Sequence, residues 1–148
     1  SITSFAQNEN KINQFEILGK WECTTNLSGI FVQTDTITYH RNNRFNAEGT
    51  VMTAINFATF KPEAAAYSTK GNGSWSIKDG FFMSVVDEFE ANNINPKNTN
   101  DKFLEEINKS VQKGTTTSAV TKLINNEIWL TEDETEKVLS LCTKTKAN

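Results

Sequence analysis

His40 is the only histidine of the 148-residue sequence, and Cys23 and Cys142 are its only cysteines, so few side chains could act as nucleophile, base or metal ligand. A Ser–His–Asp or Cys–His arrangement would have to use His40. This residue stands beside a predicted hairpin turn, on the strand face that carries Thr36 and Thr38 and that we expect to point to solvent. A haem held by an axial histidine would need an inward one. The sequence therefore predicts no catalytic residue and no haem.

The acidic residues also offer little chemistry. Asp87, Glu88 and Glu90 end a predicted strand, and paired carboxylates can act as acid and base when one has a raised pKa. Strand alternation places Glu88 and Glu90 on one face and Asp87 on the other, which favours exposed charges. The stretch 132–134 lacks the glycine of a calcium loop and is typical of a solvated turn. One histidine and two distant cysteines do not make a zinc site, so no metal ion and no cofactor is expected.

Cys23 and Cys142 lie near opposite ends of the chain. If the first and last strands of a barrel are neighbours, a disulfide between them would contribute about 4–5 kcal/mol in the chain-entropy model. Otherwise the two residues are separate buried thiols that pack as small hydrophobic groups. A bridge would suit a periplasmic or secreted protein, as would Ser4-Phe5-Ala6, which has the pattern of a signal-peptidase site. An ordinary polar N-terminus, with a cytoplasmic location, is the alternative.

Composition excludes several classes of partner. The net charge is −3 and only two of the 15 basic residues are arginines, so no basic face for nucleic acid is predicted. No apolar run approaches the roughly 18 residues of a membrane span. Abundant threonine and asparagine favour strands with tight turns. The length suggests one domain over residues 1–148, of which 1–7 are expected to be flexible.

Hydrophobic periodicity predicts a mainly β chain with two helices. A short helix is expected over 8–17, and a second one is inserted near 101–113, where Gly114 would end it. Asn42-Asn43 and Asp79-Gly80 are predicted hairpin turns. Residues 55–67 are ambiguous between a loop over the barrel mouth and a helical turn. The predicted strands are 21–25, 31–41, 44–54, 70–77, 81–89, 115–124, 127–132 and 136–143. About eight antiparallel strands in sequence order are typical of a single up-and-down barrel.

Two short motifs, Gly19-Lys20-Trp21 after the first helix and Gly73-Ser74-Trp75, carry a family resemblance together with the pattern 127–130. With these motifs the chain resembles the lipocalin-like members of the calycin barrels, as a divergent, bacterial-type member. The resemblance implies that Trp21 packs at the closed end of the barrel. It also implies that a basic residue near the last strand, Lys144 or Lys137, covers this tryptophan. Gly19 and Trp75 are assigned to the same barrel base.

The resemblance further implies non-covalent binding of a small hydrophobic or aromatic ligand, without catalysis. Alternation along the strands places nine apolar residues inside the barrel, with Tyr39 as a polar handle. Those expected to bind the ligand are Ile37, Tyr39, Phe45, Val51, Met83 and Val85. Trp75, Ile77 and Phe81 complete the inner set. The alternative is that these side chains fill the barrel and leave no space.

Two other functions stay open. A protein-interaction or inhibitor module, including a homodimer, would expose an apolar patch around Phe57, Phe60 and Phe82. An enzyme with the barrel as reaction chamber would need an inward carboxylate with a perturbed pKa near Tyr39. Asp35 is the candidate on that strand with the required alternation.

Overall fold

The computed structural model describes residues 13–27, 31–53, 66–94, 101–111, 113–124, 128–132 and 138–145. Most of them form antiparallel strands, and two short helices are present among them. The helices are α2 (Gln14–Ile17) and α3 (Asp101–Ser110). The strands are β1 (Gly19–Leu27), β2 (Phe31–Tyr39), β3 (Arg44–Thr53), β4 (Ala66–Lys78), β5 (Phe81–Asn93), β6 (Thr116–Ile124), β7 (Ile128–Glu132) and β8 (Val138–Lys144). The prediction of a mainly β chain with an N-terminal and an inserted helix is confirmed.

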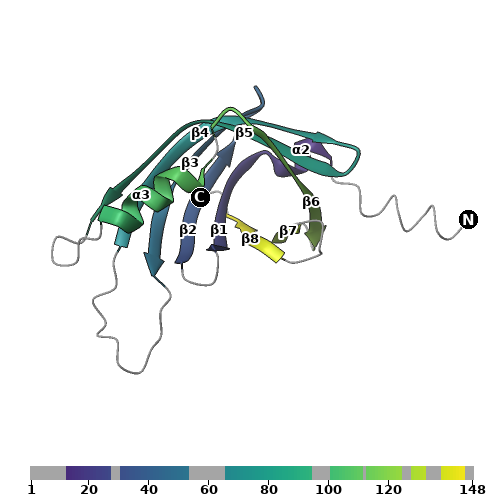
Figure 1. The fold of residues 1–148 in the computed structure, drawn as a ribbon. Helices are drawn as coiled ribbons and strands as arrows, with labels where there is room; N and C mark the ends of the chain where they lie inside the picture. Colours follow the sequence, from purple (N-terminus) through teal and green to yellow (C-terminus); the bar gives the residue numbers. More distant parts are fainter. Residues whose placement is uncertain are drawn as a thin grey trace, which may run out of the picture.

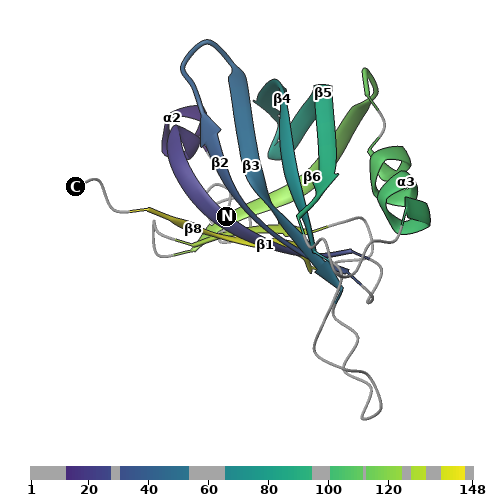
Figure 2. The same cartoon turned by 90° about the vertical axis from the view of Figure 1, so that its left-hand side faces the viewer.

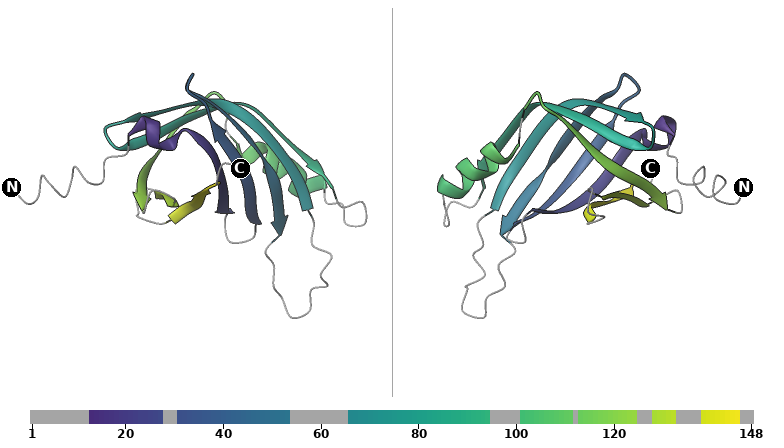
Figure 3. Two further views of the ribbon diagram at one scale, coloured as in Figure 1. Left: turned by 180° about the vertical axis from the view of Figure 1, so that it is seen from behind. Right: turned by 45° about the vertical axis from the view of Figure 1, so that its right-hand side comes forward.

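Each strand pairs antiparallel with the next one in sequence, and β1 pairs with both β2 and β8. The sheet curls strongly, so that β7 and β8 lie beneath the arch of β4 and β5 (Figure 1). The two helices lie at opposite ends of the sheet, as the turned view also shows (Figure 2). The views in Figure 3 show the same separation from behind and from the side.

Several predicted bounds are corrected. The first helix is described only over Gln14–Ile17 and not over all of 8–17, whose residues 8–12 lie outside the described part. Its start is fixed by Asn13, whose side chain accepts a hydrogen bond from the Phe15 amide at 3.0 Å. The inserted helix ends at Ser110 and not at residue 113. Lys113 instead forms an isolated bridge with Val86, and the Gly114 amide donates to the Val86 carbonyl at 2.8 Å.

The central strands are longer than predicted. β4 and β5 run over 13 residues each, where strands over 70–77 and 81–89 were predicted. Residues 54–65, which include most of the ambiguous segment 55–67, and residues 95–100 lie outside the described part. Both predicted hairpin turns are confirmed by their backbone: Asn43 has a φ of 62°, and Asp79 and Gly80 have φ values of 54° and 83°.

Two glycines permit the curl of the sheet. A β-carbon on Gly73 would overlap the Val85 carbonyl oxygen and would lie 2.8 Å from the Phe45 ring. A β-carbon on Gly49 would overlap the Thr34 carbonyl oxygen of β2. Neighbouring strands approach so closely at these positions that no side chain fits.

A β-bulge interrupts the pairing of β4 with β5. Asn72 pairs with Glu88 and Gly73 pairs with Val86, so Asp87 is an extra residue on β5. An extra residue reverses the alternation of side chains beyond it. On β5 the inward positions are therefore even-numbered before the bulge and odd-numbered after it.

Trp21 occupies the centre of the first hydrophobic cluster. Its side chain is fully buried, and its indole N–H donates to the Ile17 carbonyl at 2.8 Å, which attaches α2 to this end of the sheet. Lys144 Nζ lies 5.5 Å from the Trp21 ring centroid, as the family resemblance implied for a basic residue. Lys137, the other candidate, lies outside the described residues. Trp75 belongs to the same cluster, and Gly19 leads into β1 with a φ of 112°.

Cys23 and Cys142 are paired across β1 and β8 and form a disulfide. The sequence left this bridge and two separate thiols as alternatives, and the structure has the bridge. It joins residues 119 positions apart, so it restricts nearly the whole unfolded chain.

The double variant Cys23→Ala/Cys142→Ala should lose about 4–5 kcal/mol of unfolding free energy, because its unfolded chain regains the entropy of a very long loop. Urea unfolding of the oxidised protein and of the variant measures this difference. Wild-type protein with its disulfide reduced serves as the control and should unfold like the variant. Equal stability of oxidised protein and variant would contradict the prediction.

Gly73→Ala should destabilise the chain by about 2–4 kcal/mol, because the new methyl group meets a backbone carbonyl that cannot move aside. Gly71→Ala is the matched control, since its β-carbon would lie 3.1 Å from the nearest atom, the Glu88 carbonyl oxygen. The control should cost under about 1 kcal/mol. Comparable losses in the two variants, measured by thermal or urea unfolding, would show that close packing at Gly73 does not hold the curl.

Candidate functional site

We call the face of the sheet that carries Trp21, Tyr39 and Trp75 the inner face. Its end nearest α2 is filled by aromatic packing. The Tyr39 ring lies 5.3 Å from Trp75 and 5.6 Å from Phe82 between centroids, both edge-on. Phe45 packs beside them at 6.2 Å from Tyr39. This end of the inner face is therefore a hydrophobic core.

The other end of the inner face is covered by α3. Ile107 of this helix packs with Val51, Tyr67 and Ala91, all of which are buried on the inner face. Asn108 fixes the helix: its Oδ1 accepts from the Ala91 amide at 3.2 Å. The inserted helix therefore covers one end of the inner face and does not pack on the outer wall.

Between these two clusters lies a stretch with small side chains, which we call the waist: Asp35, Ala47, Gly49 and Gly71. Along β3 the order is Phe45 in the first cluster, then Ala47 and Gly49, then Val51 in the second. At about 3.3 Å per residue, Phe45 and Val51 are roughly 20 Å apart. All four waist residues keep partial solvent exposure, whereas Phe45 and Val51, which flank Ala47 and Gly49 along β3, are buried. Thr69 of β4, which pairs with Gly49, is also buried.

Asp35 is the ionisable group of the waist. Its backbone is paired with Cys23 on one side and Gly49 on the other. Its Oδ1 is buried, and no described residue forms a hydrogen bond with that oxygen. Burial raises the pKa of the Asp35 carboxyl from 3.8 to about 6. Burial, and then the negative charge of Asp35, also raises the pKa of the Tyr39 hydroxyl.

No basic side chain of the described parts of the neighbouring strands β1 and β3 pairs with the Asp35 carboxylate. Alternation and register place the lysines and arginines of the described parts of β1 to β5 on the outer face. Lys144 of β8 lies over the Trp21 ring, at the end of the inner face nearest α2. Asp35 was expected from sequence only as the inward carboxylate that an enzyme would need. The lack of a hydrogen-bond partner at its Oδ1 depends on the packing of several strands and could not be read from sequence.

The predicted ligand-binding residues lie in three different places in the structure. Ile37, Tyr39 and Phe45 belong to the filled end, and Val51 belongs to the cluster under α3. Met83 and Val85 are a correction: they lie on the outer face and border a surface hollow of about 320 Å³. Their alternation partner Phe81 is 46% exposed, whereas Phe82 is 9% exposed in the core.

The cause of this correction is the hairpin turn. A two-residue turn at Asp79-Gly80 pairs Lys78 with Phe81, so both side chains point to the same face. Lys78 is exposed, and Phe82 must therefore point inward. Burial of Phe82 also removes it from the exposed patch expected for an interaction module, while Phe57 and Phe60 lie outside the described residues.

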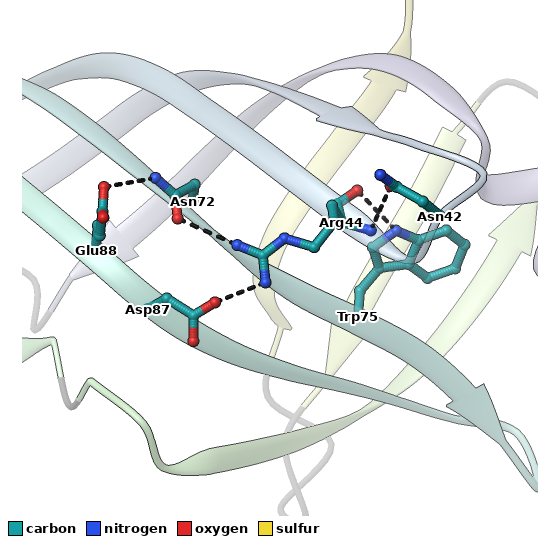
Figure 4. A network of polar contacts seen from close by, with 6 residues as sticks. All are labelled: Asn42, Arg44, Asn72, Trp75, Asp87 and Glu88. Carbon is teal, nitrogen blue, oxygen red and sulfur yellow. Dashed lines mark hydrogen bonds and ion pairs between the residues drawn. The ribbon is translucent and has the colours of Figure 1, made fainter.

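The acidic residues of β5 belong to a structural network on the outer face (Figure 4). Arg44 Nη1 contacts Asp87 Oδ2 at 2.6 Å, and Asn72 donates to Glu88 Oε2 at 3.0 Å. Asp87 and Glu88 thus share one side, where simple alternation predicted opposite sides, because Asp87 is the bulged residue. Both carboxylates are exposed and neighbour an arginine or an amide, so the network spans the bulge and shows no carboxylate pair arranged for acid–base chemistry.

Other candidate groups are not assembled into a site. His40 is partly buried, and its Nε2 lies 3.1 Å from the Asn46 amide nitrogen. A hollow of about 790 Å³ crosses the outer face, lined mostly by hydroxyl, amide and charged side chains such as Thr36, Glu48 and Lys70. Gly49 of the waist and its partner Thr69 also line this hollow. Within the described ranges no cluster of metal-ligating side chains occurs. Residues 133–134 of the acidic turn lie outside these ranges.

No described helix has the length and the apolar character needed to cross a bilayer. Comparison of the chain with protein-family models and with curated proteins finds no match. The functional argument therefore depends on the residues of the inner face.

Asp35→Asn should abolish part of the pH dependence of stability. Below about pH 3 the carboxyl is protonated in both states. As pH rises from about 3 to 6, the unfolded chain loses its proton first, so the folded state loses stability. At pH 7.5 the Asn variant should be more stable than wild type by about 1–3 kcal/mol, and at pH 4 the two should be nearly equal. Urea unfolding at both pH values tests this. An Asn variant that is less stable at pH 7.5 would overturn the assignment of Asp35 as an uncompensated buried charge.

Proposed function

We propose that the chain is a lipocalin-like, up-and-down barrel that binds a small, mainly apolar or aromatic molecule at the waist without chemical change. The observation that carries this proposal is the partly exposed stretch of small residues between two buried clusters on one face. Ligand sites in proteins are typically apolar cavities with few, well-placed polar groups, and the waist has this composition.

Closure of the barrel is part of the proposal. The pairing of β1 with both β2 and β8 supports it, and the disulfide holds the β1–β8 contact covalently. A closed barrel of about eight strands is wide enough for one small ligand. Aromatic packing at one end and α3 at the other would then leave the waist as the interior space.

A reaction chamber is the second candidate, because Asp35 is an inward carboxylate with a raised pKa beside Tyr39. A general base with a pKa near 6 could accept a proton at neutral pH. Binding alone is better supported, since the described inner positions of β1 to β5 add no histidine, second carboxylate or free thiol that could complete a catalytic set.

The disulfide supports an oxidising compartment, periplasmic or extracellular. Such bridges persist outside the reducing cytosol. A secreted or periplasmic carrier of small molecules would meet its ligand in that compartment.

Native mass spectrometry of protein purified without reducing agent should show a small mass that is lost on denaturation. Ala47→Leu should reduce this bound fraction at least about threefold, because the larger side chain occupies the waist. Thr34→Leu, a similar enlargement at an outward position of β2, is the matched control and should leave the bound fraction unchanged.

A bare protein mass in all variants would count against ligand binding. A dominant dimer peak without a small mass would favour the interaction module with a filled barrel. Equal loss of ligand in Ala47→Leu and Thr34→Leu would place the ligand elsewhere than the waist.

A further inference from the structure

We propose that the molecule bound at the waist carries a protonated amine, and that this ammonium group pairs with the Asp35 carboxylate. The ligand class is therefore a small organic cation with an apolar or aromatic body. This inference rests on the proposed function and specifies the chemistry of the same site.

The first step is the missing partner of Asp35. A buried carboxylate is costly unless it is paired and hydrogen bonded. Here Oδ1 is buried without a described partner, and β1, β3 and β4 present no cation to it. The groups that face Asp35 across its pairs are Cys23, whose sulfur is in the disulfide, and Gly49, which has no side chain. A bound cation would supply the countercharge that the described residues do not provide.

The second step is the exclusion of other ligand charges. An anion placed at the waist would be repelled by Asp35, and no inward lysine or arginine of β1 to β5 would compensate. A neutral hydroxyl could donate to Oδ1, but a hydrogen bond between two charged groups is roughly twice as strong. Among ligands of equal size, the ammonium form gains most from this carboxylate.

The third step concerns the body of the ligand. The waist is bordered by Ile37 and Phe45 on one side and by Val51 and Phe89 on the other, so apolar surface flanks the carboxylate in both directions. Ala47, Gly49 and Gly71 add no bulk between them. An apolar or aromatic body of a few carbon atoms could contact either cluster while its nitrogen reaches Asp35.

Binding should also depend on pH. Tyr39 of β2 is the titratable group that interacts with Asp35, and its raised pKa keeps the hydroxyl neutral through pH 8. The facing positions of β1, β3 and β4 do not titrate. Protonation of Asp35 at low pH removes the negative charge, so affinity for an ammonium ligand should fall as pH drops from 7.5 to 5.

The test uses three matched probe sets with phenyl, indole and octyl bodies: 2-phenylethylamine, tryptamine and octylamine, each with the corresponding alcohol and a carboxylate of similar length. Isothermal calorimetry at pH 7.5 and pH 5 gives the affinities for wild type, Asp35→Asn and Glu22→Gln. Glu22 is an exposed, outward carboxylate next to Cys23 in sequence, so its variant controls for a loss of net charge.

At least one amine should bind wild type about tenfold more tightly than its alcohol, with no detectable binding of the carboxylate. Asp35→Asn should lower the affinity for that amine by about 10-fold to 100-fold. Its affinity for the alcohol should change by less than about threefold. Glu22→Gln should bind all probes like wild type. Between pH 7.5 and pH 5, the affinity of wild type for the amine should fall about tenfold. The affinity of Asp35→Asn should not change between these pH values.

Tighter binding of the alcohols or carboxylates, or an unchanged amine affinity in Asp35→Asn, would overturn the inference and leave the proposed function standing. The same holds if the mass released from native protein is a neutral or anionic molecule. Binding of no probe, together with a bare native mass, would overturn both proposals.

Discussion

The close approach of neighbouring backbones at Gly49 and Gly73 is the constraint on which the other features depend. Only a residue without a β-carbon fits beside the carbonyl oxygens of Thr34 and Val85, and this contact allows the sheet to coil. Coiling brings β8 back to β1, which makes the Cys23–Cys142 disulfide geometrically accessible. It also gives the sheet an inner face on which two separate clusters are buried.

The buried charge of Asp35 opposes this stability. Folding removes its carboxylate from water and provides no described cation in return, so the folded chain is less stable at neutral pH than it would be with a neutral residue there. Uncompensated costs of this kind are typical of functional sites, where stability is given up for binding or chemistry. The exposed ion pairs Arg44–Asp87 and Glu48–Lys70 differ from this buried charge. Water screens their charges, so each pair changes the free energy of unfolding little.

Much of the fold could be predicted because its signals are local. Turn dipeptides at Asn43 and Asp79-Gly80 have the positive φ values that their residue types favour, and period-two patterns located the strands. The predicted inward set on β5 was wrong, and its error also has a local cause. The two-residue turn pairs Lys78 with Phe81, so the register counted from the turn assigns Phe82 to the core. The reversal at Asp87 could not be seen, because a bulge is set by pairing with β4 and leaves no clear mark in one strand.

The inner site depends on long-range register, which a single sequence does not reveal. Asp35 lies in the waist because β3 places Gly49 opposite it, and because Ala47 and Gly71 pair in the next ladder. The residues that let the sheet coil are thus among those that leave its middle without bulk. A larger side chain at Gly49 would collide with β2, so the chain cannot fill the waist at that point without losing its curvature. The glycine that lets β3 approach β2 thus also leaves small side chains beside Asp35, the inward carboxylate of the described parts of β1 to β5.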